Sequence, residues 1–520
     1  MLSRRAFLGS SSLAALRLFG EPAPSASPSP DLEKLGAVAL REAKKLKATY
    51  CDIRIVRYRE QSLTLRMSPE HGTGKTLEVP GIGEESSFGF GVRVIADGAW
   101  GFAASPLVTP EEIARVTAES TAMARVNATL RAKPILLAPV PKYRDRWVSP
   151  FERDPFDVPI EEKLDLLRRA ASEIKKQKRV QMSFASLNFR AEDKYFASSE
   201  NSSLQQYIVT TYGHISGSAV DISRGIARTR NYVPTQREAG WEYVATMNLL
   251  ENAARIREEV VEHLSAPPVA AGRKDLVLLP SHLFLTIHES VGHPTELDRS
   301  LGYEANYAGT SYITPSTIGK RIASDLVTFY GDRTYPGGLA TVGYDDDGVK
   351  ATRFPIVENG IFRHFQTTRE QAHLVGESES RGCSFADSWA TMPFQRMPNV
   401  WLAPGKPEVT LNDIISGVDD GILIDGRGSY SIDQQRYNFQ FGGDAFWEIK
   451  GGKKGGMISR VSYQARTPDF WQSCDAIAGP SYWEQFGTTG DAKGEPMQIN
   501  SISHGCSPAR FRRVNVLLTD

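Results

Sequence analysis

Cysteine is scarce in this chain of 520 residues, which contains four: Cys51, Cys383, Cys474 and Cys506. Cysteines so few and so far apart cannot form a disulfide scaffold, and no Cys-x-x-Cys pair occurs. An excess of one charge is missing as well, because 61 Lys and Arg residues balance 61 Asp and Glu residues. A neutral chain lacks the electrostatic basis for nucleic acid or an anionic membrane surface as its main partner.

Long runs of apolar residues are missing as well. No stretch beyond the N-terminus approaches 18 consecutive apolar residues, and the run Ala6–Phe19 is interrupted by glycine, serine and arginine. That run is too short and too polar to cross a hydrocarbon core of about 30 Å. The preceding Arg4 and Arg5, in the form SRRAFLG, resemble the twin-arginine export signal of bacteria.

We therefore expect residues 1–30 to be an export signal and a linker, the linker being the Pro/Ser-rich stretch EPAPSASPSP. The resemblance implies a protein exported by the twin-arginine route to the periplasm or another extracytoplasmic compartment, with no membrane attachment beyond the signal. Cleavage of the signal is left open.

Residues 31–270 carry mixed patterns. Residues 51–68 and 88–103 alternate apolar and polar side chains with a period near two, as strands do. Thr109, followed by a proline and two acids, marks the start of a helix. Apolar residues at helical spacing predict further helices over residues 31–47, 160–177 and 240–264.

Residues 271–520 show a different pattern. After about residue 310, short apolar runs are separated by Gly, Asp and Pro, and helical stretches are few. This pattern is typical of a β-rich barrel or sandwich. The predicted fold class is thus α+β, with an N-terminal α+β domain over residues 31–270 and a β-rich domain over residues 271–520.

The segment LFLTIHESVGHPTELDR contains the pattern His-Glu-x-x-x-His, formed by His288, Glu289 and His293. In the zinc-peptidase pattern His-Glu-x-x-His, the histidines are separated by about 400° of helical rotation, so both rings share a face. A spacing of five gives about 500°, which turns the second ring roughly 140° away on a regular α-helix. The pattern therefore predicts a distorted helix, and Gly292 tolerates a π-type bulge or a helix end there.

If the helix is distorted, His288 and His293 can bind Zn²⁺ as neutral imidazoles and leave one position for water. Glu289 would then accept a proton from that water and pass it to the leaving amine. Two histidines do not complete a zinc site, and the alternative is a pair of hydrogen-bonded histidines in the core.

Further motifs surround this one. In chain order they are SFGFGVRVIADGAWGFA, HESVGHPTE, GGLATVGYDDDGVKATRFPIVENGIFRHF, QRMPNVWLAPG and KGEPMQINSISHGCSPARF. Taken together, they resemble the TldD/PmbA metallopeptidases, the TldD type in particular, from about residue 31 to the end. The resemblance implies a barrel-like C-terminal domain that carries the metal-site helix. It also implies dimers, of identical or related subunits, around a cavity that admits extended or unfolded peptides.

The resemblance assigns His288 and His293 as metal ligands and Glu289 as the general base. In the TldD type the third ligand is a Cys two residues before a Lys, and the matching triplet here is Asp491-Ala492-Lys493. Asp491 therefore takes the place of the cysteine. A carboxylate binds zinc at about 2.0–2.2 Å, although a His₂Asp set is less selective for zinc than His₂Cys.

Two cysteines, Cys506 and Cys474, remain alternative third ligands, and burial as small apolar side chains is the common fate of such residues. His504, beside Cys506, is a candidate for orienting a substrate carbonyl. The expected function is a zinc-dependent peptidase acting on peptides or unfolded polypeptide segments. The alternative is a non-catalytic peptide-binding or precursor-maturation partner, because the family includes such a subunit without the His-Glu-x-x-x-His pattern.

Overall fold

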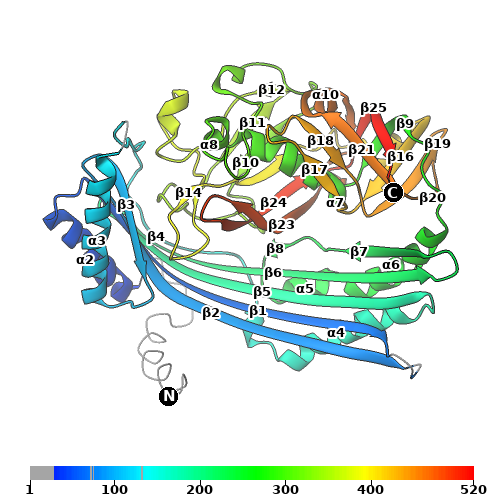
Figure 1. The fold of residues 1–520 in the computed structure, drawn as a ribbon, viewed down its shortest axis with the longest axis horizontal. Helices are drawn as coiled ribbons and strands as arrows, with labels where there is room; N and C mark the ends of the chain where they lie inside the picture. Colours follow the sequence, from blue (N-terminus) through cyan, green and yellow to red (C-terminus); the bar gives the residue numbers. More distant parts are fainter. Residues whose placement is uncertain (1–28, 71–72, 74, 131–132, 520) are drawn as a thin grey trace.

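The computed structural model describes residues 29–70, 73, 75–130 and 133–519 (Figure 1). The predicted export signal over residues 1–30 thus lies outside the described residues, except for its last two positions. No helix within these ranges is both long enough and apolar enough to cross a membrane.

The N-terminal half is built on one long sheet with the strand order β3-β2-β1-β5-β6-β4, to which β7 and β8 add beside β6. Its pairs are antiparallel, except that β4 runs parallel to β6. The strands are β1 (Tyr50–Pro69), β2 (Thr76–Ala96), β3 (Ala99–Ser105), β4 (Arg144–Val148), β5 (Val180–Ser198), β6 (Ser203–Asp221), β7 (Ile226–Tyr232) and β8 (Arg237–Glu238).

Helices cover one face of this sheet in two groups (Figure 1). The first group packs on one end of the strands and consists of α2 (Pro30–Lys45) and α3 (Pro110–Ala128). The second packs on the other end and consists of α4 (Ile160–Lys175), α5 (Glu242–Thr246) and α6 (Leu249–Ser265), preceded by the 3₁₀ turn η1 (Pro155–Asp157).

The expected helices and strands of this half are confirmed, including the cap in which Thr109 accepts a hydrogen bond from the Glu112 amide. One prediction needs correction. The helix expected over residues 240–264 is two helices, because Asn248 between them takes a left-handed backbone (φ 50°) that asparagine tolerates better than most residues.

The C-terminal half contains two open sheets and a short ribbon, so the barrel that the resemblance implied is not formed within the described residues. The six-stranded sheet has the order β12-β11-β10-β15-β24-β23, and the nine-stranded sheet has the order β17-β18-β21-β25-β9-β16-β19-β20 with β22 beside β25. Both sheets contribute to one hydrophobic core. The arrangement is a sandwich of two sheets, the alternative that the sequence pattern had left open.

The strands of the six-stranded sheet are β10 (Phe329–Asp332), β11 (Arg353–Glu358), β12 (Ile361–Phe362), β15 (Asn399–Leu402), β23 (Glu484–Lys493) and β24 (Gln498–Cys506); the ribbon is β13 (Ser384–Phe385) with β14 (Phe394–Gln395). The strands of the nine-stranded sheet are β9 (Gly272–Leu278), β16 (Asp420–Asp425), β17 (Tyr430–Ile432), β18 (Asn438–Phe441), β19 (Ala445–Lys450), β20 (Lys453–Ile458), β21 (Val461–Arg466), β22 (Cys474–Ile477) and β25 (Ala509–Leu518).

Short helices complete the C-terminal half. The α-helices are α7 (Pro280–Ile287), α8 (Leu297–Ser300), α9 (Leu411–Ser416) and α10 (Thr467–Gln472). The remaining turns are η2 (His288–Gly292), η3 (His293–Thr295), η4 (Pro315–Thr317), η5 (Ala372–Val375) and η6 (Pro480–Tyr482). Helix α7 contacts β23 and β24 of one sheet and β16 of the other, so it lies between the two sheets.

Ion pairs join the two halves. The face of the long sheet opposite its helices carries Arg93 and Lys194, which pair with Asp347 (2.9 Å) and Asp346 (2.8 Å) of the C-terminal half. All four side chains are buried. Removing one member of a buried pair leaves an uncompensated charge, so these contacts fix how the halves dock.

A buried histidine in α7 predicts how stability depends on pH. The His282 ring is fully buried, its Nδ1 lies 2.9 Å from the Gly426 carbonyl oxygen and its Nε2 lies 2.8 Å from the Tyr463 hydroxyl. Burial lowers the pKa of His282 from 6.5 to about 4. Between pH 6.5 and pH 4 this histidine is protonated in the unfolded chain but stays neutral in the native structure. The free energy of unfolding therefore decreases as the pH falls through this range.

We expect this one group to lower the free energy of unfolding by about 2 kcal/mol between pH 7.5 and pH 5. Denaturant titration of the chelated wild-type protein and of the His282→Gln variant at both pH values measures the contribution. From pH 7.5 to pH 5, the free energy of unfolding of the variant should decrease by about 2 kcal/mol less than that of the wild type. Equal decreases in the two proteins would show that His282 is not the responsible group.

Candidate metal centre

The helix that carries the two histidines is distorted in the predicted way. Residues His288–Gly292 form a π-turn directly after α7, and the His293 amide donates to the His288 carbonyl, five residues back. Such a turn brings residues five apart onto one face. The two imidazole rings accordingly lie together, with centroids 4.5 Å apart.

The sequence explains why a regular helix stops here. Pro294 has no amide hydrogen and its ring would clash with the carbonyl four residues earlier, so an α-helix cannot run through this point. Gly292 contributes differently from the expectation. Its backbone is ordinary helix (φ −54°, ψ −64°), but a Cβ there would lie 2.4 Å from the Met397 sulfur. The close approach of the Met397 side chain, and not backbone freedom, is therefore the feature that favours glycine here.

Asp491 reaches the same point from β23. Its Oδ1 lies 3.5 Å from Nε2 of His288 and 3.4 Å from Nε2 of His293. All three side chains are buried. The structure therefore brings together the two histidines and the carboxylate that the resemblance placed in the third ligand position.

These donor atoms fit a divalent metal ion. Four ligands around zinc at about 2.0–2.1 Å in tetrahedral geometry lie about 3.3–3.4 Å from one another, close to the observed separations. Each histidine uses its Nδ1 in a hydrogen bond, His293 to Glu296 and His288 to His504. With the proton on Nδ1, the Nε2 atom of each ring carries a lone pair and faces the Asp491 carboxylate oxygen. Three acceptors that converge with no donor between them suit a cation and are unfavourable without one.

Glu296 fixes the orientation of His293. Nδ1 of His293 lies 2.9 Å from Oε2 of Glu296, so the ring donates to the carboxylate and presents Nε2 to Asp491. Arg299 Nη2 lies 3.1 Å from the same Nδ1, but this guanidinium has its own acceptor in Glu296, 3.0 Å from its Nε. We therefore assign the Nδ1 proton to the bond with Glu296.

A buried charge network supports Glu296. Lys493 Nζ lies 3.1 Å from Glu296 and 2.9 Å from Asp298, and all three side chains are nearly inaccessible. Burial by itself raises the pKa of Glu296, but Lys493 and Arg299 together hold this pKa well below its ordinary value. Glu296 therefore stays ionised as the acceptor for His293.

Arg396 performs the same task for Asp491. Its Nη2 donates to Asp491 Oδ2 at 2.9 Å and also to the Asp491 carbonyl, and Arg396 is fully buried. One carboxylate oxygen is thus held by the guanidinium, which leaves Oδ1 directed at the histidines. This geometry allows Asp491 to bind a metal through a single oxygen.

His504 lies behind His288 and is fully buried. Its Nε2 is 2.9 Å from Nδ1 of His288. Burial, followed by the neighbouring His288, lowers the pKa of His504 well below its ordinary value, so the ring is neutral and accepts the His288 proton. The Nε2 atom of His504 thus has a protein partner, whereas the expected role of this ring in orienting a substrate carbonyl stays a prediction.

Glu289 lies beside the histidines, and its carboxylate is within 4.8 Å of ligand atoms of both rings. Its Oε2 forms an ion pair with Arg436. The two cysteines considered as ligands, Cys506 and Cys474, are buried members of the C-terminal hydrophobic core.

Arg436 has no signal in the sequence pattern, because it comes from a loop more than 100 positions away from the histidines. Arg396 and His504 lie in two of the motifs that carry the resemblance, QRMPNVWLAPG and KGEPMQINSISHGCSPARF, but the motifs do not reveal their contacts at the metal site. His504 was singled out only as a candidate for orienting a substrate carbonyl. Glu296 and Lys493 do have a signal, because one follows His293 by three residues and the other follows Asp491 by two.

Comparison with known proteins identifies the family. Three family models match in succession: PmbA/TldA metallopeptidase domain 1 over residues 77–124, the central domain over residues 153–266, and the C-terminal domain over residues 271–516. The predicted boundaries at residues 30 and 270 remain predictions. The long sheet runs through both regions matched by the first two models.

Curated relatives are named metalloproteases. One from Methanocaldococcus jannaschii is 26% identical over 440 residues, covering 82% of this chain and 89% of the relative. A "Metalloprotease TldD homolog" from Buchnera aphidicola is 28% identical over 378 residues, covering 71% of this chain and 74% of the relative. A "Zinc metalloprotease TldD homolog" from Saccharolobus solfataricus is 23% identical over 403 residues, covering 74% and 79%.

Solved structures share the fold. A putative modulator of a DNA gyrase from Thermotoga maritima aligns with a TM-score of 0.72 at 15% identity, over 94% of this chain and all of that one. TldE from Thermococcus kodakarensis aligns with a TM-score of 0.68 at 18% identity, over 93% and 99%. The three family models together span most of the sequence, and the chain therefore belongs to the PmbA/TldD family of metallopeptidases.

Proposed function

We propose that this chain is a zinc-dependent peptidase that hydrolyses peptides or unfolded polypeptide segments. His288, His293 and Asp491 would hold the ion, and Glu289 would act as the general base. The observation that carries the proposal is the single Asp491 oxygen lying 3.4–3.5 Å from both Nε2 atoms. The name of the Saccharolobus relative supports zinc as the metal.

Each polar group near the ion would have a separate task. A zinc ion, when bound, polarises the scissile carbonyl and lowers the pKa of a water molecule. Glu289 takes the proton from the attacking water and later delivers it to the leaving nitrogen. Glu296 and His504 keep the two imidazoles oriented, and we propose this supporting role for His504 in place of a substrate contact.

Extended substrates suit the position of Asp491. Strand β23 lies at one end of the six-stranded sheet, and the described residues provide no strand partner on its other side. A peptide can add to such an edge through main-chain hydrogen bonds, which place few demands on its sequence. We therefore propose broad specificity for unstructured polypeptide.

A partner subunit is part of the proposal. The similarity to TldE, a structure of the same fold, supports pairing with a related subunit, and a dimer of identical chains is the other possibility. The same similarity keeps a non-catalytic binding role as the second candidate function. We also propose export by the twin-arginine route to the periplasm, which fractionation of cells producing the full chain would test.

Removal of the metal tests the function. Chelation of the purified protein is expected to abolish cleavage of denatured casein, and stoichiometric zinc is expected to restore it, because the ion and Glu289 act together. Metal content per chain separates the two candidates. A protein that carries no zinc, or that cleaves equally well after chelation, would contradict a zinc peptidase and favour the binding role.

A further inference from the structure

A loop far from the histidines in sequence reaches Glu289. The turn between β17 and β18 carries Arg436, whose Nη1 pairs with Oε2 of Glu289 and whose Nη2 donates to the Ala308 carbonyl at 3.3 Å. The Arg436 side chain is 13% exposed. Its Nε is buried and has no hydrogen-bond partner in the part of the chain that the structure describes. The guanidinium therefore has unused donor capacity beside the general base.

The backbone of this turn is unusual and firmly held. Arg436 has a φ of 60°, in the left-handed region that favours glycine. The turn is fixed in place by three hydrogen bonds: Thr467 Oγ1 donates to the Arg436 carbonyl at 2.7 Å, the Thr310 amide to Gln434 at 2.7 Å and the Tyr312 amide to Gln435 at 2.9 Å. The turn therefore holds the Arg436 backbone firmly in place beside Glu289.

We infer that Arg436 is a catalytic residue that compensates the negative charge formed on the scissile carbonyl oxygen. This inference rests on the proposed function and deepens it. In the resting site the guanidinium is balanced by the Glu289 carboxylate. The balance changes only when Glu289 takes up a proton, which is the first chemical step of the proposed reaction.

The charges can be followed through that reaction. The water oxygen bonds to the carbonyl carbon, the water proton moves to Glu289, and the electron pair of the C=O bond moves onto the carbonyl oxygen. Glu289 is then neutral, so the Arg436 guanidinium is free to pair with the new oxyanion. The oxyanion electron pair then re-forms the C=O bond, and the C–N bond breaks as Glu289 returns its proton to the leaving nitrogen. The second water proton, still on the carboxylic acid product, passes to the freed amine, so the products leave as a carboxylate and an ammonium ion. Arg436 pairs with Glu289 again.

Such a donor acts mainly on the transition state. Removing one preorganised oxyanion donor from a serine protease lowers kcat by about 10²–10³-fold, and we use this range for Arg436. Because the ground-state carbonyl carries little charge, the KM should change far less. The position of Arg436 predicts a kcat effect with intact zinc binding, since none of its described contacts involves His288, His293 or Asp491.

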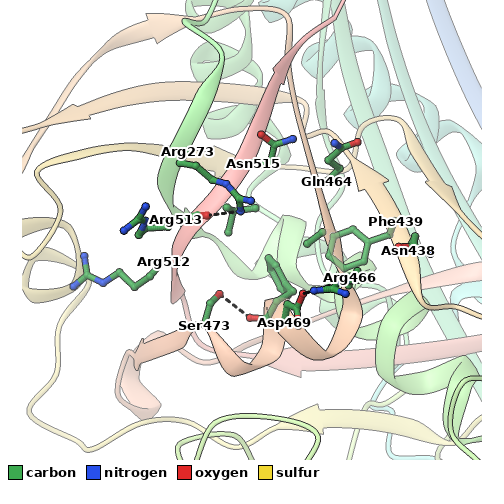
Figure 2. A pocket seen from close by; sticks show the side chains of 13 residues that line it. Arg273, Asn438, Phe439, Gln464, Arg466, Asp469, Ser473, Arg512, Arg513 and Asn515 are labelled. Atoms are coloured by element: carbon green, nitrogen blue, oxygen red, sulfur yellow. Dashed lines mark hydrogen bonds and ion pairs between the residues drawn. The ribbon is translucent and has the colours of Figure 1, made fainter.

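The test compares Arg436→Gly and Arg436→Lys with Arg513→Gly. Arg513 has the same left-handed backbone (φ 53°) but is exposed at a groove of about 530 Å³ on the nine-stranded sheet (Figure 2). The control therefore makes the same substitution at the same backbone conformation without altering the site. Purified zinc-loaded proteins are assayed for kcat and KM on an internally quenched unstructured peptide, and for zinc affinity by chelator competition. Binding of a phosphinic peptide, whose charged oxygens mimic the oxyanion, is also measured.

We expect Arg436→Gly to lower kcat by about 10²–10³-fold and to weaken phosphinic peptide binding by a similar factor, with zinc affinity and KM within about threefold of wild type. Arg436→Lys should recover at least about tenfold of the lost kcat, because it restores the charge. Arg513→Gly should match wild type. If Arg436→Gly keeps wild-type kcat, or loses zinc in parallel with activity, the inference is wrong while the proposed function stands. A zinc-loaded wild type that neither cleaves peptide nor binds the phosphinic compound overturns both.

Discussion

Glu289→Gln is expected to keep zinc bound and to lower kcat for peptide cleavage by about 10³-fold, within the range of about 10²–10⁴ that a general base contributes. Glutamine has nearly the same shape, and its carbonyl oxygen can still accept from Arg436, so the site should remain folded. It cannot take a proton from water, however. Metal analysis of the purified variant and steady-state kinetics on an unstructured peptide measure both outcomes.

A second Glu of similar surroundings provides the control. Glu377 pairs with His364 (2.7 Å) and Arg381 (2.9 Å) in the C-terminal half, so it shares the His/Arg environment of Glu289 without belonging to the metal site. Glu377→Gln should retain wild-type kcat. Cleavage by Glu289→Gln at the wild-type rate would exclude Glu289 as the base.

Substitution of Asp491 is expected to have the largest effect on the metal. Asp491→Asn replaces an ionised ligand by a neutral amide and leaves the buried Arg396 without its carboxylate partner. Loss of an outer partner of a zinc ligand costs about 10–100-fold in affinity, so loss of the ligand itself should cost more. Zinc affinity by chelator competition should therefore fall by more than about 100-fold, and peptide cleavage should fall with it.

Asp491→Cys distinguishes a ligand from a structural residue. A thiolate at this position restores an anionic donor, and one of greater selectivity for zinc, so the variant should bind zinc at least as tightly as wild type. Cys506→Ser and Cys474→Ser should retain zinc, because both cysteines belong to the hydrophobic core. Loss of zinc from either serine variant, with zinc retained in Asp491→Asn, would move the third ligand to that cysteine.

The site illustrates which features a sequence can predict. If His288 and His293 bind one ion, their five-residue spacing requires a distorted helix, and helical periodicity leads to that conclusion. The π-turn confirms it. Asp491 could be placed only through the resemblance, because nothing in residues 484–493 marks a ligand 198 positions from His293. Arg436 could not be placed at all, since its contact with Glu289 depends on how two distant loops meet.

In the fold, too, local features could be predicted from the sequence, whereas contacts between distant segments could not. Alternating strands and capped helices identified several elements of the N-terminal half, and the change of pattern after residue 310 identified the β-rich half, because these depend on local chemistry. Whether the C-terminal strands close into a barrel depends on which edge strands pair, and these strands lie far apart in the sequence. The expectation of a barrel was wrong, because the strands form two open sheets. The alternation in residues 51–68 and 88–103 likewise does not show what covers the polar face of the long sheet. In the structure Arg93 and Lys194 are buried there by ion pairs with the C-terminal half.

The position of the metal ion is the most direct test of this account. A crystal of the zinc-loaded protein, measured on both sides of the zinc absorption edge, should show one anomalous peak per chain. We expect that peak at about 2.0–2.2 Å from Nε2 of His288, Nε2 of His293 and Oδ1 of Asp491, with Glu289 close by but not bound. A peak on a cysteine sulfur, or no peak between the two imidazoles at full zinc loading, would contradict it.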